Sequence, residues 1–384
     1  MKDKKIYPPS TIGILGGGQL GRMLTQEASK MGYKVIALDP TPNCPCAQVC
    51  NEQITAEFND KKAVLNLARR SDILTYEFEN IPAEVVRYLE DQGFSIFPSS
   101  NILEITQNRI KEKKFLKSIG VLTTDFKVVE GYCDLREASL KIGLPAVLKT
   151  STGGYDGKGQ IVLKSEEDIK NIQKDIFCRE LIYEKFVPFI KEISIICARS
   201  KDGRVRTFPV TENIHRNNIL YMSIAPARVS VAVEKKAVDI AKRVAEGFEL
   251  IGVIGVEMFL LKDETILVNE ISPRVHNSGH YTIEACYTSQ FEQHIRAICG
   301  LPLGLTKLLS PAVMINILGD KVSHNKAKLV GIDKALSLPG VNLHFYGKAD
   351  TRPGRKMGHL TVLSDTSKEA IKLAEEAKRL LHWS

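Results

Sequence analysis

The sequence predicts a protein of several domains, in which a parallel α/β sheet is followed by antiparallel α+β structure. The chain has 384 residues, more than one hydrophobic core usually spans. Strand and helix patterns alternate from residue 11 to about residue 97, which is typical of a parallel sheet covered by helices. Beyond residue 145 short strands follow one another through tight turns, which indicates antiparallel sheet.

The composition favours a soluble enzyme that handles small anions. The 43% hydrophobic and 26% charged residues are ordinary for a globular protein. The first ten residues lack the apolar core of a signal peptide, and no apolar run reaches the roughly 18 residues of a membrane helix. We therefore expect a cytoplasmic protein with no membrane partner. The net charge of +8 favours phosphorylated small molecules over nucleic acid, because no long basic run or RNA-binding motif accompanies it.

The stretch GILGGGQLG at 13–21 fits the dinucleotide fingerprint G-x-G-x-x-G through Gly16, Gly18 and Gly21. A strand at 12–15 precedes it, a helix at 19–31 follows, and a second strand ends at Asp39, where NAD enzymes often place a ribose-binding acid. Physically, however, the fingerprint indicates only a phosphate at a helix N-terminus. An NAD dehydrogenase is therefore one interpretation.

The remaining elements follow in order from the same periodicities. In the first region we expect strands at 72–78 and 94–97 and helices at 60–70, 82–92 and 99–120. In the second we expect strands at 146–150, 160–165, 181–187, 192–200, 204–214, 252–261 and 265–271, and helices at 233–247 and 282–298. Strands at 311–318, 341–347 and 359–364 predict a small β-rich domain at the C-terminus.

The loop STGGYDGKG at 151–159 joins two of these strands and carries four glycines, Asp156 and Lys158. Backbone N–H groups of such a loop can approach phosphate oxygens without obstruction from side chains. The Walker pattern fails because Lys158 is followed by Gly159 and no helix follows. We interpret the loop as a flap over a triphosphate, with Lys149 as a second cation; a flexible hairpin is the alternative.

The strands GVEMF and LVNEI place Glu257, Asn269 and Glu270 in an otherwise apolar hairpin. Two carboxylates are costly to bury there without compensation. A divalent cation with a preference for oxygen ligands, usually Mg²⁺, would remove that cost. A structural salt bridge from Arg274 to these carboxylates is the alternative.

Three weaker signals surround this hairpin. The backbone of segment 184–187 can hydrogen-bond adenine, and Glu192 can bind the ribose hydroxyls. The alternative is that this segment is a solvated strand face. The loop 274–281 suits a small anion or carbonyl group, and zinc at its two histidines is disfavoured because HExxH is absent. The loop 347–359 brings together four basic side chains, Lys348, Arg352, Arg355 and Lys356. The alternative is that it is a solvated basic loop. The cysteines at 44, 46 and 50 lack a fourth metal ligand, and we expect reduced thiols of unknown role.

The motifs GGGQLGRM, TYEFEN, GGYDGKGQ, VEMF, NEISPRVHNSGH and GRKMGHL, in this order, resemble the ATP-grasp superfamily and, within it, the 5-(carboxyamino)imidazole ribonucleotide synthetase family. The similarity runs from about residue 11 to residue 363. It implies the ATP-grasp fold, with an N-terminal αβ domain (1–108), an ATP-grasp domain (109–305) containing a mobile flap subdomain (121–186), and a small C-terminal domain (306–384). Ser272 and Lys158 depart slightly from the family pattern.

The resemblance also implies roles for individual residues. ATP phosphates would be held by Arg109, Lys149, Gly154, Tyr155, Asp156, Gly157, Lys158, Gly159 and Gln160. The rest of the nucleotide would be held by Glu184, Lys185, Phe186, Val187, Glu192, His215, Asn269 and Glu270. Glu257 and Glu270 would bind the metal. The substrate would meet Gln19, Leu20, Glu77, Glu79, Asn277, Ser278, Lys348, Arg355 and Lys356, and the catalytic groups would be Tyr155, Asp156, Arg274, His276 and Lys348.

The activity implied by this resemblance is ATP-dependent carboxylation of 5-aminoimidazole ribonucleotide by bicarbonate, through carboxyphosphate, with Mg²⁺ or Mn²⁺ as cofactor. The products would be the N5-carboxylated ribonucleotide, ADP and phosphate, and the enzyme would be a homodimer. Asp156 would orient or deprotonate the attacking amine. Two further alternatives are a formate-dependent glycinamide ribonucleotide transformylase and a non-catalytic nucleotide-binding regulator on the same fold.

Overall fold

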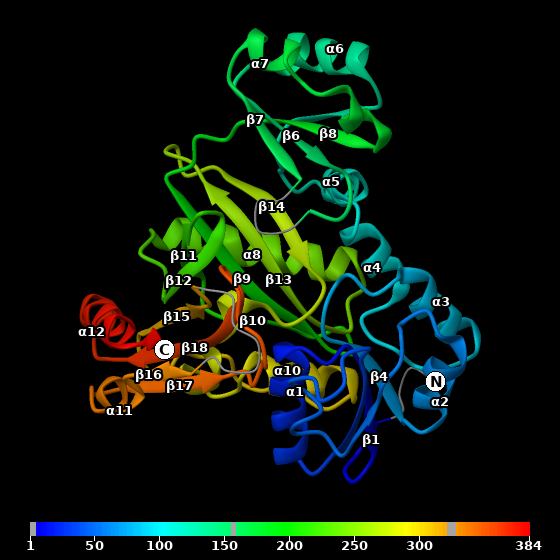
Figure 1. The fold of residues 1–384 in the computed structure, drawn as a ribbon, viewed down its shortest axis with the longest axis vertical. Helices are drawn as coiled ribbons and strands as arrows, with labels where there is room; N and C mark the ends of the chain where they lie inside the picture. The colour runs from blue at the N-terminus through cyan, green and yellow to red at the C-terminus, as the bar shows by residue number, and fades with distance from the viewer. Residues whose placement is uncertain (1–4, 155–158, 321–327) are drawn as a thin grey trace.

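A computed structural model describes residues 5–154, 159–320 and 328–384 of the chain (Figure 1). The described residues form an N-terminal parallel sheet, a long central sheet, a small antiparallel sheet and a two-stranded pair. Figure 1 shows the small sheet at the top, the central sheet in the middle and the N-terminal sheet beside its lower end.

The N-terminal sheet is parallel, as the sequence predicts. Its strand order is β3-β2-β1-β4, formed by β1 (Thr11–Leu15), β2 (Lys34–Leu38), β3 (Glu52–Ile54) and β4 (Ile73–Tyr76). The connecting helices are α1 (Gln19–Lys30), α2 (Lys61–Arg69) and α3 (Ala83–Asp91). The strand predicted at 94–97 is wrong, because only one bridge, from Ile96 to Leu74, pairs it with the sheet.

The helix predicted at 99–120 is two helices, α4 (Ser100–Thr106) and α5 (Arg109–Ser118). Asn108 separates them because its side-chain oxygen accepts hydrogen bonds from the N–H groups of Ile110 and Lys111, at 2.9 and 3.0 Å. This cap places Arg109 at the first position of α5.

The small sheet has the order β5-β8-β6-β7 and is antiparallel. Its strands are β5 (Phe126–Val129), β6 (Ala146–Thr150), β7 (Gln160–Leu163) and β8 (Leu181–Lys185). In Figure 1, α6 (Tyr132–Ile142) and α7 (Glu166–Lys170) lie above it, and a 3₁₀ helix (Lys174–Cys178) precedes β8.

The central sheet has nine strands among the described residues, in the order β14-β13-β9-β11-β12-β15-β18-β17, with β10 beside β9. They are β9 (Lys191–Arg199), β10 (Val205–Thr207), β11 (Thr211–Arg216), β12 (Ile219–Ala225), β13 (Gly252–Leu260), β14 (Ile266–Ser272), β15 (Ala312–Leu318), β17 (Val341–Phe345) and β18 (Lys356–Leu363). The predicted C-terminal strands are therefore present, and they continue the central sheet through the β12–β15 pairing.

The helices around this sheet differ partly from the prediction. The structure contains α8 (Val231–Gly247), but the helix predicted at 282–298 is broken into α9 (Thr282–Ala285) and α10 (Gln290–Ile298). The break arises because Cys286 pairs with Leu308 and the Ser289 side chain caps α10. The C-terminal region also contains α11 (Ile332–Leu336), α12 (Ser367–Leu380) and the pair β16 (Leu329–Val330) and β19 (His382–Trp383), which the sequence did not predict.

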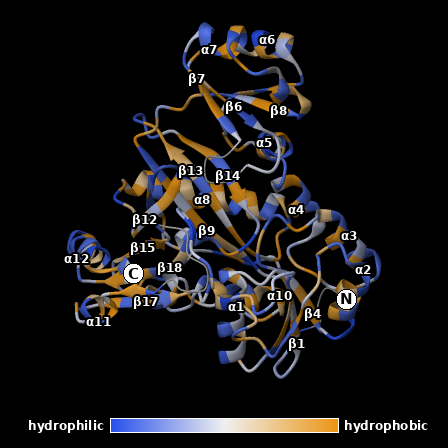
Figure 2. Cartoon of the chain, viewed as in Figure 1, coloured by the Kyte–Doolittle hydropathy of each residue, from blue (hydrophilic) through white to orange (hydrophobic). Residues whose placement is uncertain are grey.

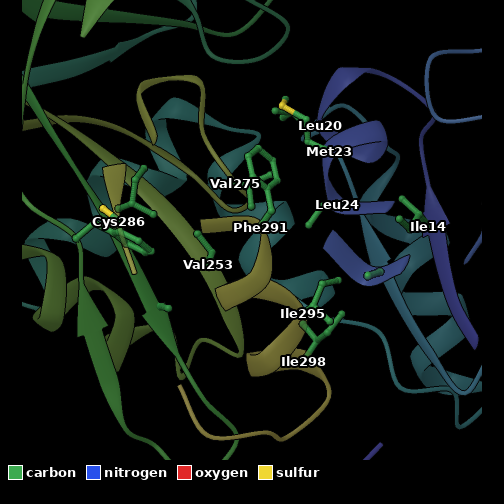
Figure 3. Close-up of a cluster of buried hydrophobic side chains, with 14 of the residues drawn as sticks. Ile14, Leu20, Met23, Leu24, Val253, Val275, Cys286, Phe291, Ile295 and Ile298 are labelled. Carbon is green, nitrogen blue, oxygen red and sulfur yellow. The ribbon is translucent and has the colours of Figure 1, made fainter. Parts of the chain in front are cut away.

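One apolar core fixes the N-terminal domain to the central sheet. In Figure 3, Met23 and Leu24 of α1 face Phe291 and Ile295 of α10, and all four side chains are buried. Figure 2 shows hydrophobic residues concentrated in the sheets and a largely hydrophilic α12 at the periphery. All eight cysteines are free. Within the described ranges, none of the helices has the length and apolarity to cross a membrane.

Candidate active site

A cavity of about 810 Å³ lies between the small sheet, the central sheet and the C-terminal basic loop. Most of the predicted site residues that the structure describes line it: Gln19, Glu79, Arg109, Lys149, Gly154, Gln160, Glu184, Lys185, Phe186, Val187, Glu192, His215, Glu257, Asn269, Glu270, Arg274, His276, Asn277, Lys348, Arg355 and Lys356. Residues from all three predicted domains thus meet in one place.

Four predicted residues in the described ranges are not part of the cavity wall: Leu20, Glu77, Gly159 and Ser278. Leu20 packs in the apolar core, and Ser278 is fully buried behind the wall, where it accepts a hydrogen bond from Ser194 at 2.7 Å. Tyr155, Asp156, Gly157 and Lys158 lie outside the described residues.

The two predicted metal ligands face each other on neighbouring strands. Glu257 of β13 and Glu270 of β14 are register partners, beside an irregularity that follows Glu257. Burial raises the pKa of Glu270, and the charge of Glu257 raises it further. Burial acts upward on Glu257 too, but the hydrogen bond and charge of His276, whose Nε2 lies 2.9 Å from Oε1, lower its pKa to about 2. Arg109 approaches Glu270 at 3.5 Å.

This pair of oxygen ligands fits a hard divalent cation that takes its other ligands from phosphates and water, as Mg²⁺ does. The charge of Glu257 disfavours ionisation of Glu270, and a bound cation would relieve this repulsion. No cluster of three or more His, Cys, Asp or Glu side chains suited to a metal occurs in the part of the chain that the structure describes.

Lys149, predicted to hold phosphate, pairs with Glu184, predicted to hold the rest of the nucleotide. Its Nζ donates to Glu184 Oε2 at 3.0 Å. A second lysine, Lys113 of α5, lies 3.5 Å from the same oxygen. The sequence did not single out Lys113 or its neighbour Glu112, because the run KEKK in a helix is typical of a solvated face.

The wall beyond β8 is mainly apolar. Phe186 and Val187 line it, and the rings of Phe189 and Phe259 stack with centroids 4.7 Å apart. The sequence analysis missed this aromatic pair, although two phenylalanines flanking the proposed nucleotide motifs were a usable signal. At the rim His215 Nδ1 and Glu192 Oε2 are 2.5 Å apart.

The salt bridge considered for Arg274 exists, but with a different partner. Arg274 Nε donates to Glu79, which comes from the N-terminal domain, and not to Glu257 or Glu270. Burial raises the pKa of Glu79, but the guanidinium outweighs it and brings that pKa to about 2. The pair connects the N-terminal domain to the loop after β14.

The glycine turn requires a correction. Its N–H groups do not lie open to a phosphate, because Gly18 and Gly21 donate to Glu77 at 3.0 and 3.2 Å, and Gly17 donates to Asp39 at 2.7 Å. Burial raises the pKa of Glu77, with these N–H groups acting in the opposite direction. Gln19, the first residue of α1, lines the cavity beside this turn.

The C-terminal loop brings Lys348, Arg352, Arg355 and Lys356 to the far side of the cavity. Lys348 is the most perturbed of them: burial and the charge of Arg355 lower its pKa to about 7. Its Nζ donates to the carbonyl oxygen of Lys356 at 2.7 Å. A doubly charged phosphate placed here would restore the ammonium form of Lys348.

Comparison with known proteins assigns each part of the chain to a family. Residues 10–107 match the ribonucleotide synthetase preATP-grasp domain, residues 114–291 the ATP-grasp domain, and residues 312–373 the phosphoribosylaminoimidazole carboxylase C-terminal domain. The fold class predicted from the sequence is thereby confirmed.

The chain is also similar to individual proteins over nearly its full length. It is 48% identical over 371 residues to the N5-carboxyaminoimidazole ribonucleotide synthase of Bacillus subtilis, covering 97% of this chain and 96% of the relative. An N5-carboxyaminoimidazole ribonucleotide synthetase solved with ADP superposes with a TM-score of 0.90, at 47% identity and 97% coverage of each chain. The Aspergillus clavatus enzyme, solved with ADP and 5-aminoimidazole ribonucleotide, gives 0.88 at 33% identity and 99% coverage of each.

Replacing Arg274 by Met should destabilise the protein by about 2 kcal/mol at pH 7, because the partly buried Glu79 carboxylate loses its partner. In the unaltered protein the lowered pKa of Glu79 stabilises the fold above its unfolded value near 4 and loses this effect only as pH falls toward 2. The deficit of R274M should therefore shrink between pH 7 and pH 5, where the unpaired carboxyl takes up a proton. Thermal unfolding across this range measures it, and a constant deficit would contradict the pairing.

Proposed function

This chain belongs to the N5-carboxyaminoimidazole ribonucleotide synthetase family of ATP-grasp ligases, and we propose that its cavity joins bicarbonate to the amine of 5-aminoimidazole ribonucleotide while ATP is cleaved to ADP and phosphate. The product is N5-carboxyaminoimidazole ribonucleotide, an intermediate of purine biosynthesis. The observation that carries the proposal is the content of the cavity: opposed carboxylates and cations at one end, and a second basic group at the other.

The chemistry requires bicarbonate to be activated, because its carbon is shielded by delocalised negative charge. Transfer of the γ-phosphoryl group to a bicarbonate oxygen gives carboxyphosphate and releases ADP. The substrate amine then attacks the carboxyl carbon, the C–N bond forms, phosphate leaves, and the amine gives up a proton. Phosphoryl transfer requires mainly in-line positioning and charge neutralisation. The cationic side chains that line the cavity, Arg109 and Lys149, are suited to provide both.

Glu257 and Glu270 would hold Mg²⁺, or Mn²⁺ in its place, and the bound ion would neutralise charge on the transferring phosphoryl group. Arg109 and Lys149 would add positive charge, and Asn269 would contribute an amide beside the carboxylates. Gly154 and Gln160, which line the cavity, would contact the phosphates.

The stacked pair Phe189 and Phe259, with Phe186 and Val187, forms an apolar wall suited to a purine base, next to Glu184 and Lys185. Glu192 and His215 at the rim would hydrogen-bond the ribose. Burial lowers the pKa of His215, but the Glu192 carboxylate outweighs it and the net shift is upward. The close contact between the imidazole and the carboxylate holds both side chains in place for such contacts.

The substrate ribonucleotide would lie at the other end, with its phosphate against Lys348, Arg355 and Lys356 and near the N–H groups of Gln19 and Leu20. Arg274 and His276, with Asn277 beside them, would surround the bicarbonate and the amine, and Ser278 supports His276 from behind through a 2.9 Å hydrogen bond. In this arrangement Glu79 would orient Arg274, and Glu77 would order the glycine turn. Tyr155 and Asp156 would complete the site from the flap, beyond the described residues.

The proposal also includes the protein's location and its oligomeric state. We propose a cytoplasmic homodimer, as the sequence resemblance implies. The exposed side chains of Tyr287, Leu305 and Leu309, around the α9–α10 break, offer apolar area for such an association.

The direct test follows phosphate release from ATP with Mg²⁺. We expect release only when bicarbonate and 5-aminoimidazole ribonucleotide are both present, and formate should not replace bicarbonate. E257Q and E270Q should each lower kcat by roughly 100-fold or more, because each removes a charge that the phosphoryl transfer requires. The exposed variant E137Q serves as the control. Two results would contradict the proposal: phosphate release that is equally fast without the ribonucleotide, or release by E257Q and E270Q that is as fast as release by the unaltered protein.

Lys348 generates a pH dependence of substrate binding. Because its pKa is about 7 in the free protein, it loses its proton as the pH rises through that value, and the neutral amine binds phosphate weakly. The affinity for 5-aminoimidazole ribonucleotide should fall above pH 7, by at most about tenfold per pH unit. K348R, whose charge persists, should flatten this dependence in calorimetric titrations. An identical pH profile in K348R would exclude Lys348 as the titrating group.

A further inference from the structure

Helix α5 buries a lysine under the nucleotide end of the cavity that the mechanism above does not use. The Lys113 side chain is only 2% exposed and does not line the cavity. Its Nζ donates to the Thr123 hydroxyl at 3.0 Å and lies 3.5 Å from Glu184 Oε2. Burying an ammonium group costs folding free energy unless the group is paired, so a function for Lys113 would explain its position.

The carboxylate that it contacts already has a partner. Glu184 Oε2 accepts a hydrogen bond from Lys149 at 3.0 Å, while Oε1 is buried and has no hydrogen-bond partner among the described residues. Two lysines therefore serve one carboxylate. Lys149 alone would be sufficient to pair Glu184 in the absence of a ligand.

The two lysines differ in what they can reach. Lys149 lines the cavity and has 14% of its side chain exposed, whereas Lys113 has 2%. A triphosphate that enters the cavity competes with Glu184 for Lys149, because it carries more negative charge than one carboxylate. Once Lys149 turns to the phosphates, Glu184 would be a buried charge without its principal partner, which is strongly unfavourable.

Lys113 cannot follow Lys149 toward the ligand because a second contact holds it. The Thr123 hydroxyl, which accepts a hydrogen bond from Lys113, donates in turn to the Val268 carbonyl at 2.8 Å, and Thr123 forms a bridge with Val268 of β14. Val268 N–H also donates to the Leu122 carbonyl at 2.9 Å. The ammonium group is thus fixed between α5, the small sheet and the central sheet.

We propose that Lys113 is a positioning residue for ATP binding: it remains on Glu184 as a permanent counter-ion when Lys149 turns to the nucleotide phosphates, so that Glu184 stays ionised and in place. This inference rests on the proposed function, since the recruitment of Lys149 by ATP is part of that function. Without Lys113, the release of Lys149 would require Glu184 to take up a proton.

The charged groups around this pair agree with such a role. Burial raises the pKa of Glu184, but Lys113, Lys149 and Arg109 together bring it below its ordinary value. Burial lowers the pKa of Lys113, with Glu184 and Glu112 acting against it.

The test is calorimetric titration of the full chain with Mg²⁺ and ATP, in buffers of different ionisation enthalpy, from pH 6 to pH 8. K113M should bind ATP with uptake of about one more proton than the unaltered protein, because Glu184 must be neutralised. Its Kd at pH 8 should rise by about tenfold or more and should recover by about tenfold per pH unit as pH falls. K113R, which keeps the charge, should restore both quantities. K111M, which removes an exposed lysine of the same helix, should match the unaltered protein.

Equal proton uptake by K113M and the unaltered protein would overturn the inference, and so would an equal loss of affinity in K113M and K113R without extra uptake. If K113M does not fold, the double variant K113M/E184Q, which lacks both charges, should regain folding, and its failure to do so would also overturn the inference. Absence of ATP binding by the unaltered protein is a different result: it would overturn the proposed function itself, and the inference with it.

Discussion

The structure is organised around two like charges that neighbouring strands force together. Glu257 and Glu270 are register partners in β13 and β14, and the repulsion between them contributes to the raised pKa of Glu270. His276 and Arg109 offset this only in part, at 2.9 and 3.5 Å. We propose that these two carboxylates, in a cavity otherwise rich in cations, bind a divalent metal that enters with a polyanion.

The other parts of the fold bring further side chains to the cavity that contains Glu257 and Glu270. The central sheet continues through β15 to β18, so that the basic loop before β18 lies on the same cavity as the hairpin of β13 and β14. The N-terminal domain reaches it through Glu79, which pairs with Arg274 across 195 positions of the chain. The small sheet supplies Lys149 and Glu184 from the opposite wall. Each of three regions therefore contributes one part of the site.

Local motifs predicted most of the described residues that line the cavity, but not how these residues pair. Glu257 and Glu270 could be predicted as site residues because they are carboxylates within two otherwise apolar strands. The glycine turn misled because nothing local indicates that Glu77, 56 residues beyond Gly21, accepts its N–H groups. Lys113 was not singled out because burial of a lysine is a property of the tertiary structure. The break between α9 and α10 likewise depends on a distant partner, Leu308.

The most direct test of this account is a crystal structure of the protein with Mn²⁺ and a non-hydrolysable ATP analogue, in which anomalous scattering locates the metal. We expect one strong anomalous peak within about 2.5 Å of carboxylate oxygens from both Glu257 and Glu270, bridging to the phosphates, with the base against the wall formed by Phe189 and Phe259. A peak remote from both carboxylates, or a base seated at the turn of Gly16 to Gly21, would contradict it.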